Sequence, residues 1–349
     1  IGYDRVPKHC ETALHALDRA RELAPDAPDT MRASGFFEYL CRKDNAAARS
    51  AFEETLRTWP GEAGAMRGMA YTCRRMGRWE EAEDWTRRAL ELDPHNSLVM
   101  WHLGAILIED HRYEEGLAAA DRAIELGPDL QFPRLGRCWA LWRGWGNTEA
   151  VAEELTRTPG RRDRNWFDVA FTNACYSGDF QTASLIAEGA PPGPAGPQQR
   201  CLAAILADAA EAAAICTEAV SHYRAECDQQ PDSIQPRLLL ARTCSLAGLH
   251  ADAEMAVADA IAMTSVETDA PGRNDALLIQ AQVLGRAGRT ERAVELVELL
   301  LATPSRLSPV LLRIDPEWAS LRGHPRIEEI IHAAGSPVPH QKDDLGDGG

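Results

Sequence analysis

Arginine and aromatic side chains recur on one face of several expected helices, and they are the residues best suited to binding chemistry in this sequence. Arginine can hold a carboxylate through two parallel hydrogen bonds, and arginine and tryptophan are favoured anchors in protein interfaces. On a helical wheel, such residues share the inner face of three expected helix pairs: Arg67, Tyr71, Arg74, Arg75, Trp101, Trp139, Trp142 and Arg143. We predict that this strip binds an acidic or aromatic segment. The segment would belong either to a partner protein or to another domain of a longer protein from which this chain is expected to come.

The same strip also has a purely structural interpretation. Trp139, Trp142 and Trp145 recur at every third position, which fits the core of a degenerate helix pair, with the arginines solvated. The sequence leaves both interpretations open.

Motifs for catalysis or cofactor binding are absent from the sequence. It contains no phosphate-binding loop, no His-Glu-x-x-His zinc motif and no Gly-x-Ser-x-Gly nucleophile motif. Acidic pairs such as Glu80-Glu81 stand where second helices are expected to begin, and the helix dipole favours negative charge there without any acid–base role. We therefore predict that this chain is not an enzyme and has no catalytic, cofactor or metal site.

Composition narrows the class of partner. The chain has 349 residues, of which 45% are hydrophobic and 26% charged, and its formal net charge is −16. This excess of acid disfavours binding to phosphate backbones, so the short basic stretch 161–164 is expected to be a solvated turn. No apolar run is long enough to cross a membrane, and the first residues lack the apolar core of a signal peptide. We expect a protein or peptide partner, no nucleic acid, no membrane and a cytoplasmic location.

The nine cysteines lie singly within apolar helical patterns, and none belongs to a Cys-x-x-Cys pair. An odd number of cysteines in a long chain does not fit a disulfide framework, which is typical of short secreted domains. We therefore expect buried free thiols that pack as small hydrophobic side chains in a reducing compartment.

Prolines punctuate the first part of the chain at a nearly constant interval. Pro25, Pro60, Pro94 and Pro128 each follow an apolar helical segment in which two small residues stand two helical turns apart. Small residues on one face let two helices approach closely, and proline fits just past a helix end because it cannot continue the helix. The interval matches the period of the tetratricopeptide repeat, about 34 residues, whose helix pairs stack because one pair cannot bury its apolar face alone.

The pattern divides the chain into six parts. The period loosens after Pro128, and the turn glycines Gly248 and Gly288 lie further apart than one such period, so the last repeats carry extra residues. Too few residues precede Glu11 for a first helix, so we expect a chain cut from a longer protein. The expected parts are a partial repeat with a second helix only (1–25), an N-terminal repeat stack (26–189), a Pro/Gly linker or kink (190–197), a C-terminal repeat stack (198–305), capping helices (306–335) and a disordered tail (336–349).

Two segments resemble the tetratricopeptide C-terminal regions of large bacterial signalling proteins. The sequence Arg-Arg-Met-Gly-Arg-Trp-Glu-Glu-Ala at 74–82 is similar to the second complete repeat of that group, and residues 311–326 resemble its usual ending. The group commonly has Asp-Pro where Ala319-Ser320 stand and Phe where Ile327 stands. Its repeats follow a serine/threonine kinase, a class III adenylate cyclase or a winged-helix DNA-binding domain, and that half is absent from this chain.

These observations predict an all-α tetratricopeptide-repeat superhelical solenoid of about eight helix pairs. The resemblance implies a non-catalytic protein–protein interaction and regulatory module of a bacterial signalling protein, which binds a peptide or a partner domain in its concave groove. Two alternatives stay open. One is an adaptor for secretion or envelope assembly, and the other is part of an enzyme whose active site lies outside or within the solenoid.

Overall fold

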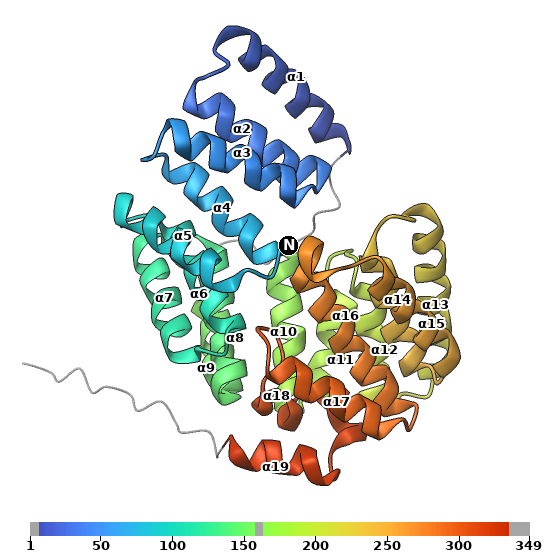
Figure 1. Ribbon diagram of the computed structural model, residues 1–349. Coiled ribbons are helices and arrows are strands. Elements are labelled where there is room, and N and C mark those ends of the chain that lie inside the picture. The colour runs from blue at the N-terminus through green and yellow to red at the C-terminus, as the bar shows by residue number, and fades with distance from the viewer. Residues whose placement is uncertain (1–6, 158–162, 335–349) are drawn as a thin grey trace, which may run out of the picture.

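Helices make up the regular structure of this protein in the computed structural model, which describes residues 7–157 and 163–334 (Figure 1). No strand occurs in these two stretches, and the predicted all-α fold is confirmed. The predicted tail, 336–349, and Arg161 and Arg162 of the basic stretch lie outside the described residues. The helices in chain order are α1 (Pro7–Leu23), α2 (Pro28–Phe37), the π-helical turn η1 (Glu38–Arg42), α3 (Asn45–Thr58), α4 (Ala63–Arg75), α5 (Trp79–Leu92), α6 (Ser97–Glu109), α7 (Tyr113–Leu126), α8 (Gln131–Trp145), α9 (Thr148–Arg157), α10 (Arg164–Ser177), α11 (Phe180–Gly189), α12 (Gly196–Leu206), α13 (Ala212–Gln229), α14 (Ile234–Leu246), α15 (His250–Ala262), α16 (Val266–Arg286), α17 (Thr290–Leu301), α18 (Pro309–Ile314), the 3-10 helix η2 (Pro316–Leu321) and α19 (Pro325–Ala333).

Helix α1 packs against α2 and has no first helix of its own among the described residues, and α2 to α17 form eight successive helix pairs in which each helix packs against the next. First helices of neighbouring pairs also touch: α2 contacts α4, α6 contacts α8, α12 contacts α14, and α14 contacts α16. The first helices therefore form the inner layer of a superhelix, and the second helices form its outer layer. This is the solenoid of about eight pairs that the repeat predicts.

The spaced prolines end the outer helices. α1, α3, α5 and α7 each finish two positions before Pro25, Pro60, Pro94 and Pro128, respectively. Proline has no N–H to extend a helix, so the chain turns there and a new first helix begins. The start of α6 is fixed by the side chain of Asn96, which accepts a hydrogen bond from a backbone N–H in its first turn.

Small side chains let the paired helices approach each other. Ala82, Ala123, Ala253, Ala260 and Ala293 lie at these interfaces, and each is completely buried. A larger side chain at any of them would push the two helices of its pair apart.

The superhelix closes on itself, which the repeat pattern did not predict. Helix α16 packs against α4, and α18 packs against α8. Figure 1 shows the orange and red C-terminal helices lying beside the green middle of the chain. The largest core cluster joins Leu141 of α8 and Val151 of α9 to Leu300 of α17, Leu312 of α18 and Trp318 of η2. Residues from both halves of the sequence therefore share one apolar core.

Helix α16 begins with a short turn that is separate from the rest of the helix. Asp269 has non-helical backbone angles (φ −156°, ψ 72°), and its carboxylate accepts a hydrogen bond from the N–H of Gly272 at 3.2 Å. Asp269 thus caps the longer part of the helix, and Pro271 stands in its first turn, where a missing N–H costs nothing. This turn falls in the extra residues between Gly248 and Gly288.

The capping segment and the Pro/Gly segment are both ordered parts of the stack. Trp318 and Leu321 of η2 are 1% exposed and lie in the same cluster as Leu300 of α17, so they cover the end of the last pair. The segment 190–195 is irregular, Gly196 and Pro197 begin α12, and α11 packs against α12 across it.

The expectation that all the cysteines are free thiols was wrong for four of them. Disulfides join Cys10 of α1 to Cys41 of η1 and Cys201 of α12 to Cys216 of α13. Each bond links neighbouring helices, and the helical pattern gave no sign that these side chains meet. The other five cysteines are free, and four of those are buried, as expected.

The close docking of α18 on α8 predicts a difference between two similar glycines. Gly146 and Gly178 both follow a first helix in the left-handed conformation (φ +66° and +77°), but a Cβ on Gly146 would lie 2.9 Å from Cγ1 of Val310, whereas nothing lies within 4 Å of one on Gly178. We expect Gly178→Ala to lower the free energy of unfolding by about 1–2 kcal/mol, from the backbone alone. We expect Gly146→Ala to cost about 1–3 kcal/mol more, because α18 must move. Urea denaturation of both variants measures this, and equal losses would contradict the close docking.

Candidate functional site

The predicted strip lies on first helices, as expected, but it does not form one open groove. Arg67, Tyr71, Arg74 and Arg75 belong to α4, Trp101 to α6, and Trp139, Trp142 and Arg143 to α8. Closure of the superhelix separates them into three groups with different surroundings. One group lines the concave face, a second holds the two halves of the chain together, and a third lines a central cavity.

The first group is a row of aromatic rings on the concave face. The ring of Tyr71 lies 4.3 Å from that of His102, and Trp101 stacks on Phe132 at 5.4 Å between ring centres. The indole of Trp101 also lies on the bare backbone of Gly136, where a Cβ would come within 3.1 Å of it. These rings are therefore fixed by contacts between successive first helices.

Arg67 adds a positive charge to this row. Its guanidinium lies over the ring of Phe36, 5.7 Å from the ring centre, and no carboxylate of the described residues forms an ion pair with it. Burial, followed by the nearby charges of Arg74 and Arg67, lowers the pKa of His102 well below its ordinary value. His102 is therefore neutral, and the charge of this row comes from arginine.

The second group begins with a buried ion pair. Nε and Nη2 of Arg74 donate to the two carboxylate oxygens of Glu109 at 2.9 and 2.6 Å. The Glu109 side chain is 8% exposed, and its pKa is lowered because the neighbouring Arg74 outweighs the effect of burial. The backbone oxygen of Glu109 also accepts a hydrogen bond from the N–H of Ser305 at 2.8 Å. Arg74 thus fixes the residue to which the segment after α17 is attached.

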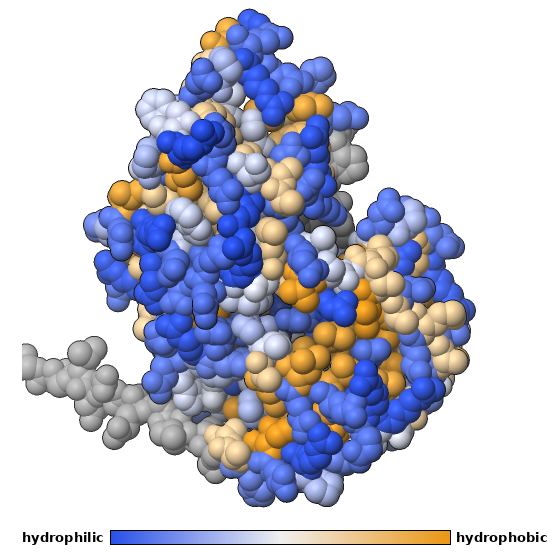
Figure 2. All heavy atoms as spheres, viewed as in Figure 1, coloured by the Kyte–Doolittle hydropathy of each residue, from blue (hydrophilic) through white to orange (hydrophobic). Residues whose placement is uncertain are grey.

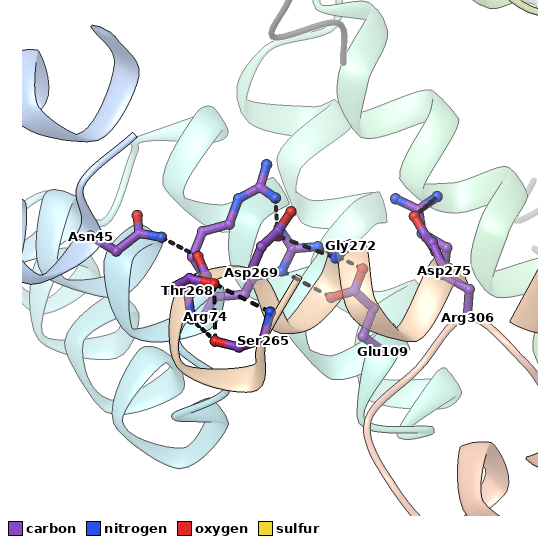
Figure 3. Close-up of polar contacts among 10 residues, drawn as sticks. Asn45, Arg74, Glu109, Ser265, Thr268, Asp269, Gly272, Asp275 and Arg306 are labelled. Atoms are coloured by element: carbon purple, nitrogen blue, oxygen red, sulfur yellow. Dashed lines mark hydrogen bonds and ion pairs between the residues drawn. The ribbon is translucent and has the colours of Figure 1, made fainter. Parts of the chain in front are cut away.

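Arg75 makes the matching contact with α16. Its Nη1 donates to Asp269 at 2.5 Å. Figure 3 shows the neighbouring contact, in which Nδ2 of Asn45 donates to the backbone oxygen of Thr268 at the same distance. The turn before α5 lies against the start of α16, since a Cβ built on Gly77 would be 2.9 Å from Cγ1 of Val266. The short first turn of α16 therefore supplies the groups that reach α3 and α4. We call these contacts, together with the hydrogen bond from Ser305 to Glu109, the closure contacts.

The third group lines a cavity of about 310 Å³ where α8, α10, α14, α16 and α18 meet. Figure 2 shows hydrophobic side chains gathered over the C-terminal helices around α16, whereas the N-terminal helices are mostly hydrophilic on the same face. The floor and walls of the cavity combine tryptophans and leucines with three arginines and two aspartates. Its lining residues are Trp139, Trp142, Arg143, Thr172, Tyr176, Gln235, Leu238, Leu239, Arg242, Asp275, Leu278, Ile279, Gln282, Arg306, Leu307, Leu311, Asp315 and Trp318.

The tryptophans and the arginine predicted for the strip have different roles in this cavity. Trp142 is 5% exposed, and its Nε1 donates to Oδ1 of Asn173 at 2.9 Å, so it is a core residue, as the structural interpretation proposed. Arg143 lies over the ring of Trp139, 5.9 Å from the ring centre. Burial, followed by the repulsion of Arg306, lowers the pKa of Arg143.

A network of buried charges forms one side of the cavity. Arg242 and Arg286 both pair with Glu317, which holds the pKa of Glu317 below its usual range. Asp315 lies beside Glu317 and accepts a hydrogen bond from the Tyr176 hydroxyl at 3.4 Å. Burial, then the charge of Glu317, raises the pKa of Asp315 to about 7. Both arginines therefore pair with Glu317, and Asp315 holds its proton more tightly than an exposed aspartate does.

No group of three or more metal-ligating side chains occurs among the residues described, and no helix there is long and apolar enough to span a bilayer. The acidic pairs Glu80-Glu81 and Glu114-Glu115 lie in the first turns of α5 and α7.

Sequence reasoning missed the acidic partners of the strip. Glu109 ends the next inner helix after that of Arg74. Asp269 belongs to the first part of an inner helix much later in the chain, so no repeat spacing brings it to Arg75. One signal was present. The long interval between Gly248 and Gly288 marks an insertion, and Asp269 with Pro271 inside it has the form of a helix cap.

Comparison with known proteins agrees with this fold. The sequence model of the tetratricopeptide repeat matches residues 39–97, so this part of the chain is a tetratricopeptide repeat. Yeast Tom70 matches over 85% of this chain and 63% of its own, with 15% identity and a TM-score of 0.54. Human IFIT1 (93% and 76% coverage, 16% identity, TM-score 0.47) and PilF of Pseudomonas aeruginosa (52% and 82%, 16%, 0.44) are more distant in shape. No curated protein matches the chain. At these identities the structural likeness concerns the fold alone.

The Arg74–Glu109 pair, which holds the residue that binds Ser305, can be tested by a double-mutant cycle. Because the carboxylate is buried, Arg74→Met leaves an uncompensated charge, and we expect a loss of about 3–5 kcal/mol in the free energy of unfolding. Glu109→Met should cost a similar amount, since it strands the arginine. The double variant should lose much less than the sum, because no charge is left unpaired. Additive losses in urea denaturation would show that the two side chains do not act as a pair.

The position of Asp315 predicts a dependence of stability on pH. The pKa of Asp315 in the folded protein, about 7, exceeds the ordinary value of 3.8. As the pH rises, the unfolded chain therefore loses the carboxyl proton at a lower pH than the folded protein does. The stabilisation that comes from protonated Asp315 is complete below about pH 4 and is lost as the pH rises to about 7. We expect Asp315→Asn to be more stable than the wild type at pH 8, with a smaller advantage or none at pH 5. Thermal melting at both pH values measures this, and a constant difference would contradict the raised pKa.

Proposed function

We propose that this chain is a non-catalytic protein-interaction and regulatory module of a bacterial signalling protein, which binds a peptide or a partner domain on its concave face. The tetratricopeptide repeats support the general class, because such superhelices act by presenting an inner surface. The observation that carries the proposal is the row of fixed aromatic rings with the unpaired Arg67 on first helices.

The proposed ligand is a segment with acidic and aromatic side chains. Arg67 offers a guanidinium to a carboxylate, and Tyr71 and Trp101 offer ring faces that are already held by His102 and Phe132. A surface that is rigid before binding loses little side-chain entropy on binding. The closure contacts provide an internal example of the chemistry, since Arg75 of the same helix holds a carboxylate of the chain itself.

Arg74, Arg75, Trp139, Trp142 and Arg143 have a different place in this proposal. Arg75 holds α16 against α4, and Arg74 is paired with Glu109 of α6. The other three residues line the cavity, so the proposed peptide surface is narrower than the strip predicted from the sequence. Another domain of the parent protein is an equally suitable ligand, because a tethered segment has a high effective concentration. The net charge of −16 disfavours nucleic acid as a partner.

The signalling context rests on the resemblance of residues 74–82 and 311–326. In such a protein the module would lie in the cytoplasm, after a kinase, cyclase or DNA-binding domain. Its effect would be regulatory, through the partner that it holds.

A second function has one specific observation in its favour. The disulfides Cys10–Cys41 and Cys201–Cys216 are typical of proteins in oxidising compartments. They favour the alternative of an adaptor for secretion or envelope assembly. Alkylation of the native protein, isolated from its own cells, followed by mass spectrometry, separates the two cases: nine reactive thiols after unfolding fit the cytoplasmic module, and five fit the exported adaptor.

A peptide array tests the proposed surface directly. We expect the purified chain to select peptides that combine Asp or Glu with Trp, Tyr or Phe over peptides of the same aromatic content with Lys or Arg. Arg67→Gln should weaken binding of the selected peptides at least fivefold. Arg122→Gln is the matched control, because Arg122 is exposed on α7 in the outer layer and pairs with Glu125 of the same helix. No preference for acidic peptides, or equal binding by the two variants, would refute the proposal.

A further inference from the structure

The central cavity contains a positive charge that the fold does not neutralise. Around it, Glu109 is held by Arg74 through two hydrogen bonds, and Asp275 pairs with Arg306 at 3.1 Å (Figure 3). Arg143 lines the cavity together with Asp275 and Arg306. Its charge adds to the lowering of the pKa of Glu109 and offsets part of the rise that burial causes in the pKa of Asp275. Arg143 forms no ion pair of its own within the described parts of the chain. The cluster thus has three guanidiniums and two carboxylates.

An unneutralised arginine in such a place is costly. Moving a cation out of water is unfavourable unless an anion or several hydrogen bonds replace the water. Arg143 has only the face of Trp139 and the more distant carboxylates, and the neighbouring Arg306 repels it. The cluster of Arg74, Glu109, Arg143, Asp275 and Arg306 is therefore short of one negative charge.

Hydrogen-bonding groups in the same cavity also lack partners. Gln282 is 1% exposed, and its Oε1 has no partner within the described residues. Nε of Arg242 is buried and unpartnered as well. Buried polar atoms are nearly always paired, so these groups mark a place where a further molecule can supply hydrogen bonds.

The remaining walls set the shape and polarity of that molecule. Trp139 and Leu278 are half-buried, and Leu311 and Trp318 are buried apolar residues that line the cavity. A volume of about 310 Å³ is at the lower end of ordinary small-molecule sites, about 300–1,000 Å³. An extended peptide does not fit in this space, whereas a ring with a short acidic side chain does.

We propose that this cavity binds a small organic anion, whose carboxylate lies between Arg143 and Arg306 and whose flat apolar body packs against Trp139 and the neighbouring leucines. This site is separate from the peptide surface around Arg67, and it goes beyond the proposed function. Arg143 belongs to α8, and Arg306 belongs to the segment between α17 and α18. A ligand that contacts both would therefore stabilise the closed superhelix.

Phenylacetate and its uncharged analogue phenylacetamide are suitable probes, because they differ only in the group that faces the arginines. By isothermal titration calorimetry, we expect the wild-type chain to bind phenylacetate at least tenfold more tightly than phenylacetamide. Arg143→Gln should weaken phenylacetate binding at least tenfold, and the control Arg122→Gln should not change it. Arg67→Gln, which tests the peptide surface, should also leave phenylacetate binding intact, so the two proposals can fail separately.

Thermal melting of the free protein tests whether Arg143 has only a structural role. Because its charge is not neutralised, Arg143→Gln should leave the Tm of the free protein unchanged or raise it. A fall in Tm comparable to that of Arg74→Met would overturn the proposal. So would equal affinity for the acid and the amide, no binding of either, or binding of inorganic phosphate as tight as that of phenylacetate, since the apolar wall would then contribute nothing.

Discussion

The apolar face that the last helix pair leaves uncovered is the constraint on which the rest of this structure depends. A pair in a solenoid buries one face against its predecessor and offers the other to its successor, and no further pair follows α16 and α17 in the described chain. Here η2 packs against α16 and α17, and α18 packs against both η2 and α8. Residues of α8, α9, α17, α18 and η2 share the largest core cluster. The cap therefore joins the end of the superhelix to its middle. An array that would otherwise stay open becomes closed.

Closure of the superhelix changes the solvent exposure of arginines on the inner layer. In an open superhelix, arginines on first helices would face water, where their charge costs little. In the closed form, Arg74 and Arg75 are half-buried, and each pairs with a carboxylate. Arg74 has Glu109, and Arg75 has Asp269, which also caps the main part of α16. One residue thus starts a helix and fastens it to a distant part of the chain.

The features predicted correctly from the sequence are those set by local spacing. The prolines at 25, 60, 94 and 128 end helices at a constant offset, and small residues such as Ala82 and Ala123 lie at pair interfaces, because both effects act within one repeat. The two disulfides link neighbouring helices, but the helical pattern does not show which cysteines face each other. The contacts of Arg75 with Asp269 and of Asn45 with Thr268 depend on how far the superhelix turns. That angle is the sum of small rotations over eight pairs, and no local pattern specifies it. For the same reason the strip on α4, α6 and α8 was expected as one groove, whereas closure divides it and places Trp142 in the core.

The closed form also connects the two proposed sites through thermodynamics. The peptide surface lies on α2, α4, α6 and α8, and the cavity lies where α8 meets the segment that begins at Ser305. Ser305 is bound to the backbone of Glu109, whose carboxylate is held by Arg74, one turn from Tyr71 on α4. An anion between Arg143 and Arg306 would favour the closed arrangement, and a partner that prefers the same arrangement would then bind more tightly. By linkage the partner must strengthen anion binding by the same factor. A partner that competes for Arg74 or Arg75 would instead oppose the anion, so the sign of the coupling between the two ligands reports whether the partner binds the closed superhelix or opens it.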